Sequence, residues 1–318
     1  MKKVLTVVLT IVGVLVLFVI YALLSYNQKF DVEYPEVQLN SDSATLAHGE
    51  YLVYGPAHCA SCHVSLEQFE AVDNGEKLPL TGGFTISFAL GSFTTSNLTP
   101  DTETGIGLRS DKEIARTLRY NVDHEGAAIL PFMPFTNMSE YDMNAIISYL
   151  RSQPAVKKEV PKTTYTVLGK LIKRFALKPA VHEQEIPAIV EAGETVAYGE
   201  YLAHSVANCY GCHTELDEKS GKFVGEPFAG GMRFKSEFVE GRTYYSPNIT
   251  PDPETGIMAD WTMEKFVERM QNGRVHQDSP MPWGPFSRVK ESDLKAIYMY
   301  ISSLEPVNNK VTIVVDES

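Results

Sequence analysis

The sequence predicts an all-α protein with two repeated domains that follow an N-terminal transmembrane helix. Three observations support this fold class: an uncharged apolar run at the start, the same order of motifs written twice, and apolar residues at helical spacing in each copy. The 318 residues are enough for two domains of ordinary size. The formal net charge of −12 excludes nucleic acid as a partner, because a phosphate backbone requires a basic face.

The N-terminal run from Val4 to Leu24 contains no charged residue over 21 positions. As a helix it spans roughly 31 Å at about 1.5 Å per residue, close to the thickness of a bilayer's hydrocarbon core. A cleaved signal sequence is the alternative, but its apolar region is normally about 7–15 residues long and ends at a small-residue cleavage site. Lys2 and Lys3 are expected to stay in the cytoplasm. We therefore expect a single-pass protein of the cytoplasmic (inner) membrane whose remaining domains lie on the periplasmic face.

Two stretches separated by 150 residues are nearly the same: GEYLVYGPAHCASCHVSLE at 49–67 and GEYLAHSVANCYGCHTELD at 199–217. Three further pairs follow in the same order: NLTPDTETGI (97–106) with NITPDPETGI (248–257), PFMPF (131–135) with SPMPW (279–283), and SEYDMNAIISYL (139–150) with KESDLKAIYMYI (290–301). Four ordered blocks indicate a duplicated domain. The expected organisation is an anchor or uncleaved signal at 1–28, a linker at 29–44, a first domain at 45–155, a basic connector at 156–190, a second domain at 191–310 and a tail at 311–318.

The last block of each repeat predicts an amphipathic helix. Apolar residues recur at i, i+3, i+4 and i+7, as Met143, Ile146, Ile147 and Leu150 and again as Leu294, Ile297, Tyr298 and Ile301. Ser110 to Glu113 (SDKE) has the pattern of a capping box at the start of another helix. Gly49 and Gly199 are either simple helix starts or positions where two helices approach closely.

The connector between the repeats contains seven lysines and arginines from 157 to 178 and a helical apolar stripe, Leu168, Leu171, Ile172 and Phe175. We expect a connector helix that is buried between the domains and whose lysines face solvent. A basic amphipathic helix on the membrane surface is the alternative.

The four cysteines form two Cys-x-x-Cys-His motifs, Cys59, Cys62 and His63, and Cys209, Cys212 and His213. Zinc requires four ligands, and adjacent Cys and His side chains rarely bind one ion. A thioredoxin-like disulfide belongs to an alternating strand–helix pattern, which this sequence lacks. Covalent attachment of a haem through both thiols, with the histidine as an axial ligand of the iron, fits the motif without strain. The sequence therefore predicts two covalently bound haem c groups.

An electron-transferring haem needs a second axial ligand, and methionine sulfur raises the reduction potential. The Met-Pro pairs at Met133 and Met281 lie before the last helix of each repeat, so we assign these two methionines as the ligands. Met138 and Met143 are expected in the core. His124 and His276 are the alternative ligands, at unequal spacings from the Met-Pro pairs.

The motifs YLxxxxxxCxxCH, NxTPDxETGI and MP, present in both repeats, resemble those of a membrane-anchored dihaem cytochrome c of class I type. The chain is similar over residues 45 to 308 to the cytochrome c subunits of bacterial quinoprotein alcohol and gluconate-type dehydrogenases. The resemblance implies two tandem class I cytochrome c domains. It also implies electron-transfer partners: a membrane dehydrogenase or quinol-oxidising complex as donor, and a terminal oxidase or soluble cytochrome as acceptor in a respiratory chain.

We expect an electron carrier and not an enzyme, with no catalytic residues. Its function would be to relay single electrons on the periplasmic side, alone or as the electron-transfer subunit of a dehydrogenase. The alternative is a dihaem cytochrome c peroxidase, which needs one haem with an open site for hydrogen peroxide. A haem-based sensor would also need an open iron. Two matched Met loops disfavour both.

Overall fold

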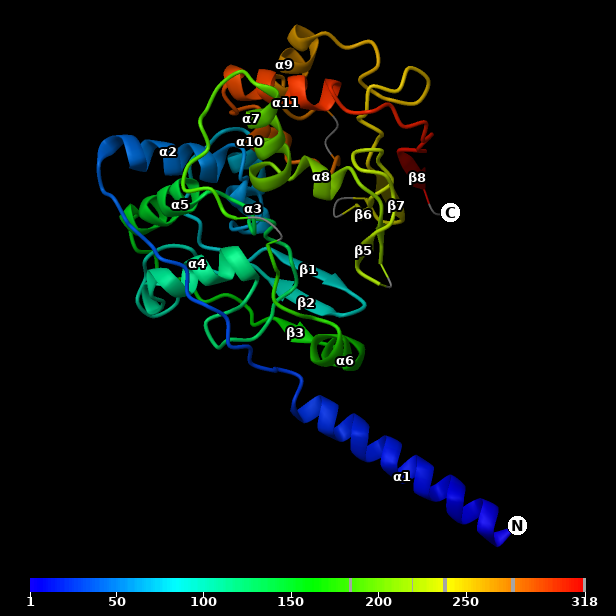
Figure 1. The fold of residues 1–318 in the computed structure, drawn as a ribbon. Helices are drawn as coiled ribbons and strands as arrows, with labels where there is room; N and C mark the ends of the chain where they lie inside the picture. Colours follow the sequence, from blue (N-terminus) through cyan, green and yellow to red (C-terminus); the bar gives the residue numbers. More distant parts are fainter. Residues whose placement is uncertain (183–184, 219, 237–238, 276–277, 317–318) are drawn as a thin grey trace.

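The computed structural model describes residues 1–182, 185–218, 220–236, 239–275 and 278–316. The N-terminal helix α1 (Lys2–Leu24) projects away from the rest of the chain (Figure 1). Its length and composition would allow it to cross a membrane, and only Ala22 in it is buried. A membrane anchor and a signal sequence both fit these properties.

Each repeat is built around one pair of crossing helices. In the first repeat α2 (Ser43–Tyr54) crosses α5 (Glu140–Ser152), and in the second α7 (Val196–Tyr201) crosses α11 (Glu291–Ser302). The remaining helices are η1 (Cys59–Ser61), α3 (Leu66–Asp73), η2 (Ile106–Leu108), α4 (Asp111–Tyr120), α6 (Val167–Phe175), the π-helical η3 (Leu202–Val206), α8 (Cys209–Cys212), α9 (Met263–Gln271) and α10 (Trp283–Phe286). The predicted stripes of the last helices are confirmed: Met143 and Ile147, and Leu294 and Ile301, are buried.

The helix crossings require the two glycines that the repeat shares. A Cβ atom on Gly49 would lie 2.1 Å from the carbonyl oxygen of Ala145, and one on Gly199 would lie 1.9 Å from that of Ala296. Both distances are far below van der Waals contact, so only glycine allows the backbones to approach this closely.

Replacing Gly49 with alanine is therefore expected to destabilise the first repeat. Forcing a methyl group into a packed crossing costs about 1–3 kcal/mol, because the helices must separate. The measurement is the free energy of unfolding in denaturant. Gly193→Ala is the matched control, since its Cβ would meet only a methyl carbon of Thr195 at 3.8 Å. Equal stability of the two variants would contradict the assigned crossing.

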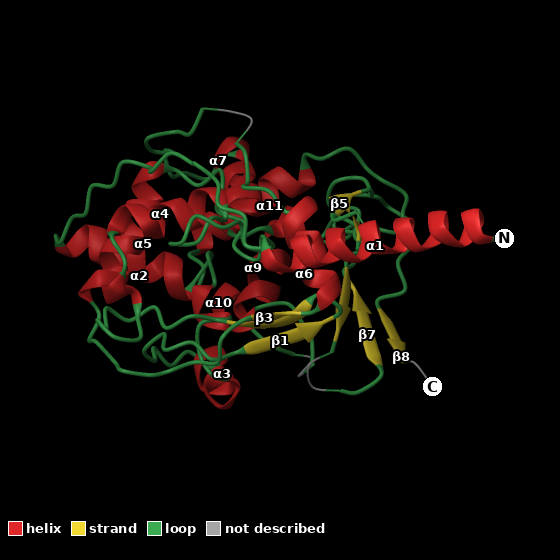
Figure 2. Cartoon of the chain, turned by 90° about the horizontal axis from the view of Figure 1, so that it is seen from below, coloured by secondary structure: helices red, strands yellow, loops and turns green. Residues whose placement is uncertain are grey.

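The expectation of an all-α fold is wrong, because about 39% of the structure is helical and the described residues also form three small antiparallel sheets. The sheets join β1 (Thr85–Phe88), β2 (Gly91–Thr94) and β3 (Thr164–Tyr165); β4 (Leu216–Asp217) and β5 (Lys222–Phe223); and β6 (Arg233–Lys235), β7 (Arg242–Tyr245) and β8 (Val314–Asp316). Figure 2 shows β1 and β3, and β7 and β8, in the lower part of the view, and β5 apart from them near α1.

The first hairpin shows why the strands form. Its sequence TISFALGSFT alternates hydroxyl and apolar side chains, which is the period of a strand. Thr85 faces Thr94 and Ser87 faces Ser92, with hydroxyl oxygens 2.8 and 2.9 Å apart. Ala89 and Leu90 make the turn, and Gly91, the first residue of β2, follows with φ +153°. Strands this short lie inside loops, where a search for helical periodicity does not find them.

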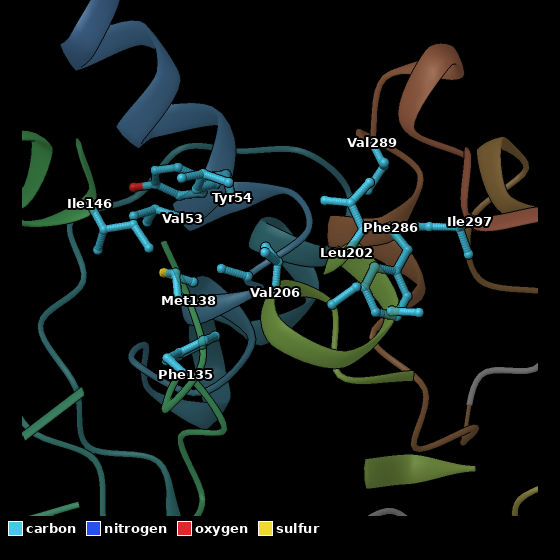
Figure 3. Close-up of a cluster of buried hydrophobic side chains, with 14 of the residues drawn as sticks. Val53, Tyr54, Phe135, Met138, Ile146, Leu202, Val206, Phe286, Val289 and Ile297 are labelled. Atoms are coloured by element: carbon cyan, nitrogen blue, oxygen red, sulfur yellow. The ribbon is translucent and has the colours of Figure 1, made fainter. Parts of the chain in front are cut away.

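One apolar core extends through both repeats. Val53, Met138 and Ile146 of the first repeat and Val206 and Phe286 of the second belong to the same cluster (Figure 3). The repeats therefore share a core instead of enclosing two separate ones.

The connector helix α6 is not buried between the repeats, so the expected arrangement is wrong. It contacts α1, and its first turn lies against the tip of the β1–β2 hairpin. Leu168 and Phe175 of its apolar stripe are exposed, whereas Gly169 and Lys173 are buried.

Candidate haem-binding sites

Both Cys-x-x-Cys-His motifs start with the same backbone turn. His58 and Asn208, each just before the first cysteine, have left-handed conformations with φ of 40° and 54°. Such values are uncommon for residues other than glycine. The chain then forms a single helical turn, in which the backbone N–H of His63 donates to the carbonyl oxygen of Cys59 at 2.9 Å. This turn places both thiols and the histidine of one motif at the end of one short segment.

The four thiols are free and half-buried. Burial raises the pKa of Cys59 and Cys209 to about 12 and that of Cys62 and Cys212 to about 11. A redox-active Cys-x-x-Cys pair has a lowered thiol pKa instead. These thiols thus lie deep in the protein yet keep accessible surface, which suits attachment of a group inside the domain.

Each motif histidine is fixed by one backbone carbonyl. His63 Nδ1 lies 2.8 Å from the carbonyl oxygen of Ser96, and His213 Nδ1 lies 3.0 Å from that of Pro247. A carbonyl oxygen can only accept, so Nδ1 carries the proton and Nε2 keeps its lone pair. Burial lowers the pKa of both histidines, against the effect of the carbonyl hydrogen bond. A neutral imidazole with a free Nε2 is the form that ligates a metal.

The two candidate methionines contact the shared core. Met133 and Met281 are half-buried and pack against the same cluster as Cys59 and Cys209. The Met281 loop is held by Arg274, whose Nη2 donates to the carbonyl oxygen of Met281 at 3.3 Å. Their role as iron ligands remains a prediction.

The alternative histidine ligands differ in their surroundings. His124 is exposed and lies beside Glu125 at 3.9 Å. His276 lies outside the described residues. The two methionines predicted for the core, Met138 and Met143, are fully buried.

In the repeated Asn-x-Thr-Pro-Asp stretch, the asparagine is buried and connects two segments of the chain through hydrogen bonds, so it does not form an open polar surface. Asn97 is buried, donates to the carbonyl oxygen of Val156 at 2.8 Å, and accepts from the backbone and hydroxyl of Thr99. Asn248 makes the same bonds to Val307 and Thr250. These contacts tie the chain after each last helix to the loop that carries the histidine-binding carbonyl.

The two repeats make reciprocal tyrosine–aspartate contacts with each other, which were not predicted from the sequence. The Tyr51 hydroxyl donates to Asp293 Oδ2 at 2.7 Å, and the equivalent Tyr201 hydroxyl donates to Asp142 Oδ2. Burial, followed by the facing aspartate, raises the pKa of both tyrosines. The available signal was that these tyrosines and aspartates recur at equivalent positions in the two repeats.

The two motifs also lie near this interface. Burial raises the pKa of the Cys212 thiol, and Cys62 of the first repeat contributes to the rise. Helix α3, which follows His63, packs on α10, which follows Met281. The interface therefore places the segment after the motif histidine of the first repeat against the segment after the candidate methionine of the second repeat.

Comparison with known proteins was made by family and by individual relative. No protein-family model matches the chain. The cytochrome c subunit of an alcohol dehydrogenase (quinone) from Gluconacetobacter polyoxogenes is 26% identical over 291 residues, which cover 84% of this chain and 58% of the relative. The cytochrome subunit of fructose dehydrogenase from Gluconobacter japonicus is 24% identical over 279 residues, covering 82% of this chain and 52% of the relative.

A third relative, a diheme cytochrome c-type protein from Cereibacter sphaeroides, is 25% identical over 233 residues, covering 70% of this chain and 71% of the relative. These three relatives, like the cytochrome c subunit of gluconate 2-dehydrogenase from Pantoea cypripedii, are cytochromes c by name. The resemblance seen in the motifs is thereby confirmed. The chain spans between half and three-fifths of the length of the alcohol and fructose dehydrogenase cytochrome subunits that it matches.

Homology to cytochromes c implies covalently bound haem c, and the residues present fit this group. Each repeat offers two enclosed thiols for thioether bonds and a neutral histidine whose Nε2 is available. Within the described residues, no group of three or more His, Cys, Asp and Glu side chains could hold a metal ion by itself. A haem needs only axial ligands from the protein, because the porphyrin supplies the other four.

Proposed function

We propose that this protein is a dihaem c-type cytochrome that relays single electrons and has no catalytic site of its own. The observation that carries the proposal is the pair of histidines, each with Nδ1 committed to a backbone carbonyl directly after a Cys-x-x-Cys turn. Homology to cytochrome c subunits of dehydrogenases supports it. The proposed domains are residues 45–155 and 191–310, each with one haem c.

In this proposal the haem iron, when bound, accepts and donates one electron. The residues of the protein would hold the geometry of each site fixed during this electron transfer. The Ser96 and Pro247 carbonyls hold the two imidazole rings in one orientation. The sulfur atoms of Met133 and Met281 would fill the second axial positions and raise the potential. The apolar core against which both methionines pack would restrict the access of water to the two sites.

The contact between α3 of the first repeat and α10 of the second supports electron exchange between the two sites within one chain. The homologues support a dehydrogenase as the proposed electron donor. A quinol-oxidising complex as the other donor, and a terminal oxidase or soluble cytochrome as the acceptor, are proposed from the resemblance of the motifs alone. We also propose that α1 anchors the protein in the inner membrane, with the haem domains on the periplasmic face. Its 23 residues, with a mean hydropathy of 3.1 over an 18-residue window, are compatible with an anchor.

The proposal is tested on the purified full-length protein by haem content, near-infrared absorption and carbon monoxide binding. We expect two haems per chain, a methionine-to-ferric-iron band whose intensity corresponds to two ligands, and no binding of carbon monoxide by the ferrous protein. One haem without the band that binds carbon monoxide would contradict the relay and favour the peroxidase alternative.

A further inference from the structure

Helix α6 leaves Leu168 and Phe175 of its apolar stripe exposed, whereas Leu171 and Ile172 of the stripe are half-buried. Leu168 is 51% exposed and Phe175 45%, and Val167 is exposed beside them. The protein-facing side instead carries Gly169, whose Cβ would lie 1.9 Å from the carbonyl oxygen of Leu90, and the buried Lys173. A helix on an ordinary water-exposed surface turns its apolar side inward and its lysines outward. Phe175 packs on α1 of this chain, whereas Val167 and Leu168 are exposed, and this indicates that their part of the apolar side has a partner outside the chain.

The position of α6 along α1 identifies the kind of partner. Phe175 stacks on Phe18 with ring centroids 5.4 Å apart. The guanidinium of Arg174 donates to the hydroxyls of Tyr21 at 3.0 Å and Ser25 at 3.1 Å. Figures 1 and 2 both show α6 beside the end of α1 that joins the rest of the protein.

Phe18 lies six residues before Leu24, the last residue of α1, which is about 9 Å along a helix axis. Amphipathic helices that lie in a membrane interface bury their apolar side about 5–10 Å into the boundary between headgroups and acyl chains. If α1 spans the bilayer, its contact with α6 holds α6 at this depth.

The exposed apolar surface continues from α6 to the first candidate site. Thr166, the N-cap of α6, donates through its hydroxyl to the carbonyl oxygen of Ala89 at 2.8 Å and so holds the tip of the β1–β2 hairpin. Phe88 at this tip is exposed, and its ring lies 6.4 Å from that of the exposed Phe132. Phe132 directly precedes Met133.

The basic residues around α6 are also suited to a membrane surface. The chain is acidic, with a net charge of −12, yet seven lysines and arginines gather between residues 157 and 178. Lys162 and Lys178 flank α6 and are exposed. Basic side chains beside an apolar stripe are the combination that binds anionic lipid headgroups.

We propose that Val167, Leu168 and Phe175, together with Phe88 and Phe132, form a membrane-seating surface that lies on an anionic bilayer. This surface would hold the first repeat and its Met133 loop against the membrane and leave the second repeat farther away. The first haem is then the one that exchanges electrons with a membrane-bound partner. The inference rests on the proposed anchoring by α1.

The test compares full-length holoprotein in nanodiscs of phosphatidylcholine and phosphatidylglycerol with its Leu168→Glu variant. Backbone hydrogen exchange is measured by mass spectrometry in peptides from α6 and α1. We expect the α6 amides to exchange at least about tenfold faster in the variant than in the wild type, since a carboxylate lifts the helix from the lipid. Leu168 is the second residue of α6, where a glutamate favours the helix through its dipole, so faster exchange would not reflect intrinsic helix loss.

Two further variants and the α1 peptides separate the outcomes. Val224→Glu is the matched control, because Val224 is 61% exposed in the second repeat and should leave the exchange of α6 unchanged. Leu168→Phe should keep the slow exchange. Protected α1 amides with no difference between wild type and Leu168→Glu would overturn the membrane-seating surface and leave the anchor intact. Rapid exchange throughout α1 would overturn the anchor itself, and with it this inference.

Discussion

Replacing Asp73 with asparagine is expected to lower the free energy of unfolding by about 3–5 kcal/mol, because the change leaves a buried arginine charge without its partner. Asp73 ends α3 in the first repeat and accepts from Arg274 of the second repeat, with Nε–Oδ2 and Nη2–Oδ1 distances of 2.6 and 3.1 Å. The two side chains are only 8% and 9% exposed. Asp73 also accepts from the backbone N–H of Gly284 at 3.0 Å.

This ion pair joins the first repeat to the Met281 loop. Arg274 donates to the carbonyl oxygens of Ser279 at 2.5 Å and Met281 at 3.3 Å. Asp73→Asn should therefore also weaken the near-infrared methionine band of the second haem and leave that of the first unchanged. A loss of stability alone would not discriminate between the two haems.

The measurements are denaturant unfolding and the near-infrared spectrum of the folded protein. Asp111→Asn is the matched control, because its ion pair with Arg151 is more exposed and lies within one repeat. Its cost should stay within about 1 kcal/mol. Asp73→Asn combined with Arg274→Met should recover part of the lost stability, since no buried charge remains unpaired. If Asp73→Asn costs no more than Asp111→Asn, the assigned role of the ion pair is wrong.

The helices could be predicted from the sequence because their periodicity and caps involve residues close together in the chain. The duplication could be predicted because the two copies are still similar in sequence. The stripe from Met143 to Leu150 lies on one face of a helix regardless of its surroundings, and the capping box at Ser110 forms between residues three apart. The motif cysteines and histidines were found for the same reason.

The sheets and the packing between repeats could not be predicted in this way, because they depend on residues distant in sequence. Strand β3 pairs with β2 across about 70 residues, and Tyr51 meets Asp293 across 242. The direction of the α6 stripe was also misjudged. Its periodicity showed that one face is apolar, but which surface this face meets is decided by α1 and the hairpin tip.

Replacing Met281 with leucine is expected to remove about half of the near-infrared methionine band and to let one of two ferrous haems bind carbon monoxide. Leucine keeps the volume and apolarity of the side chain, so the loop and the core should stay nearly unchanged. What is lost is the sulfur, and with it the proposed axial ligand and its effect of raising the potential. The affected haem should therefore titrate at a lower potential, within the range of about 0.8 V that axial ligands span.

Met133→Leu should give the same result on the other haem, because the two repeats place their Met-Pro pairs in equivalent loops. The control is Met138→Leu, since Met138 is fully buried in the core five residues from Met133 and should leave the band and the potentials unchanged. An intact band in Met281→Leu would show that another group ligates the second iron. The relay would then depend on a different residue, and a site that binds carbon monoxide already in the wild type would make peroxide chemistry the better explanation of this protein.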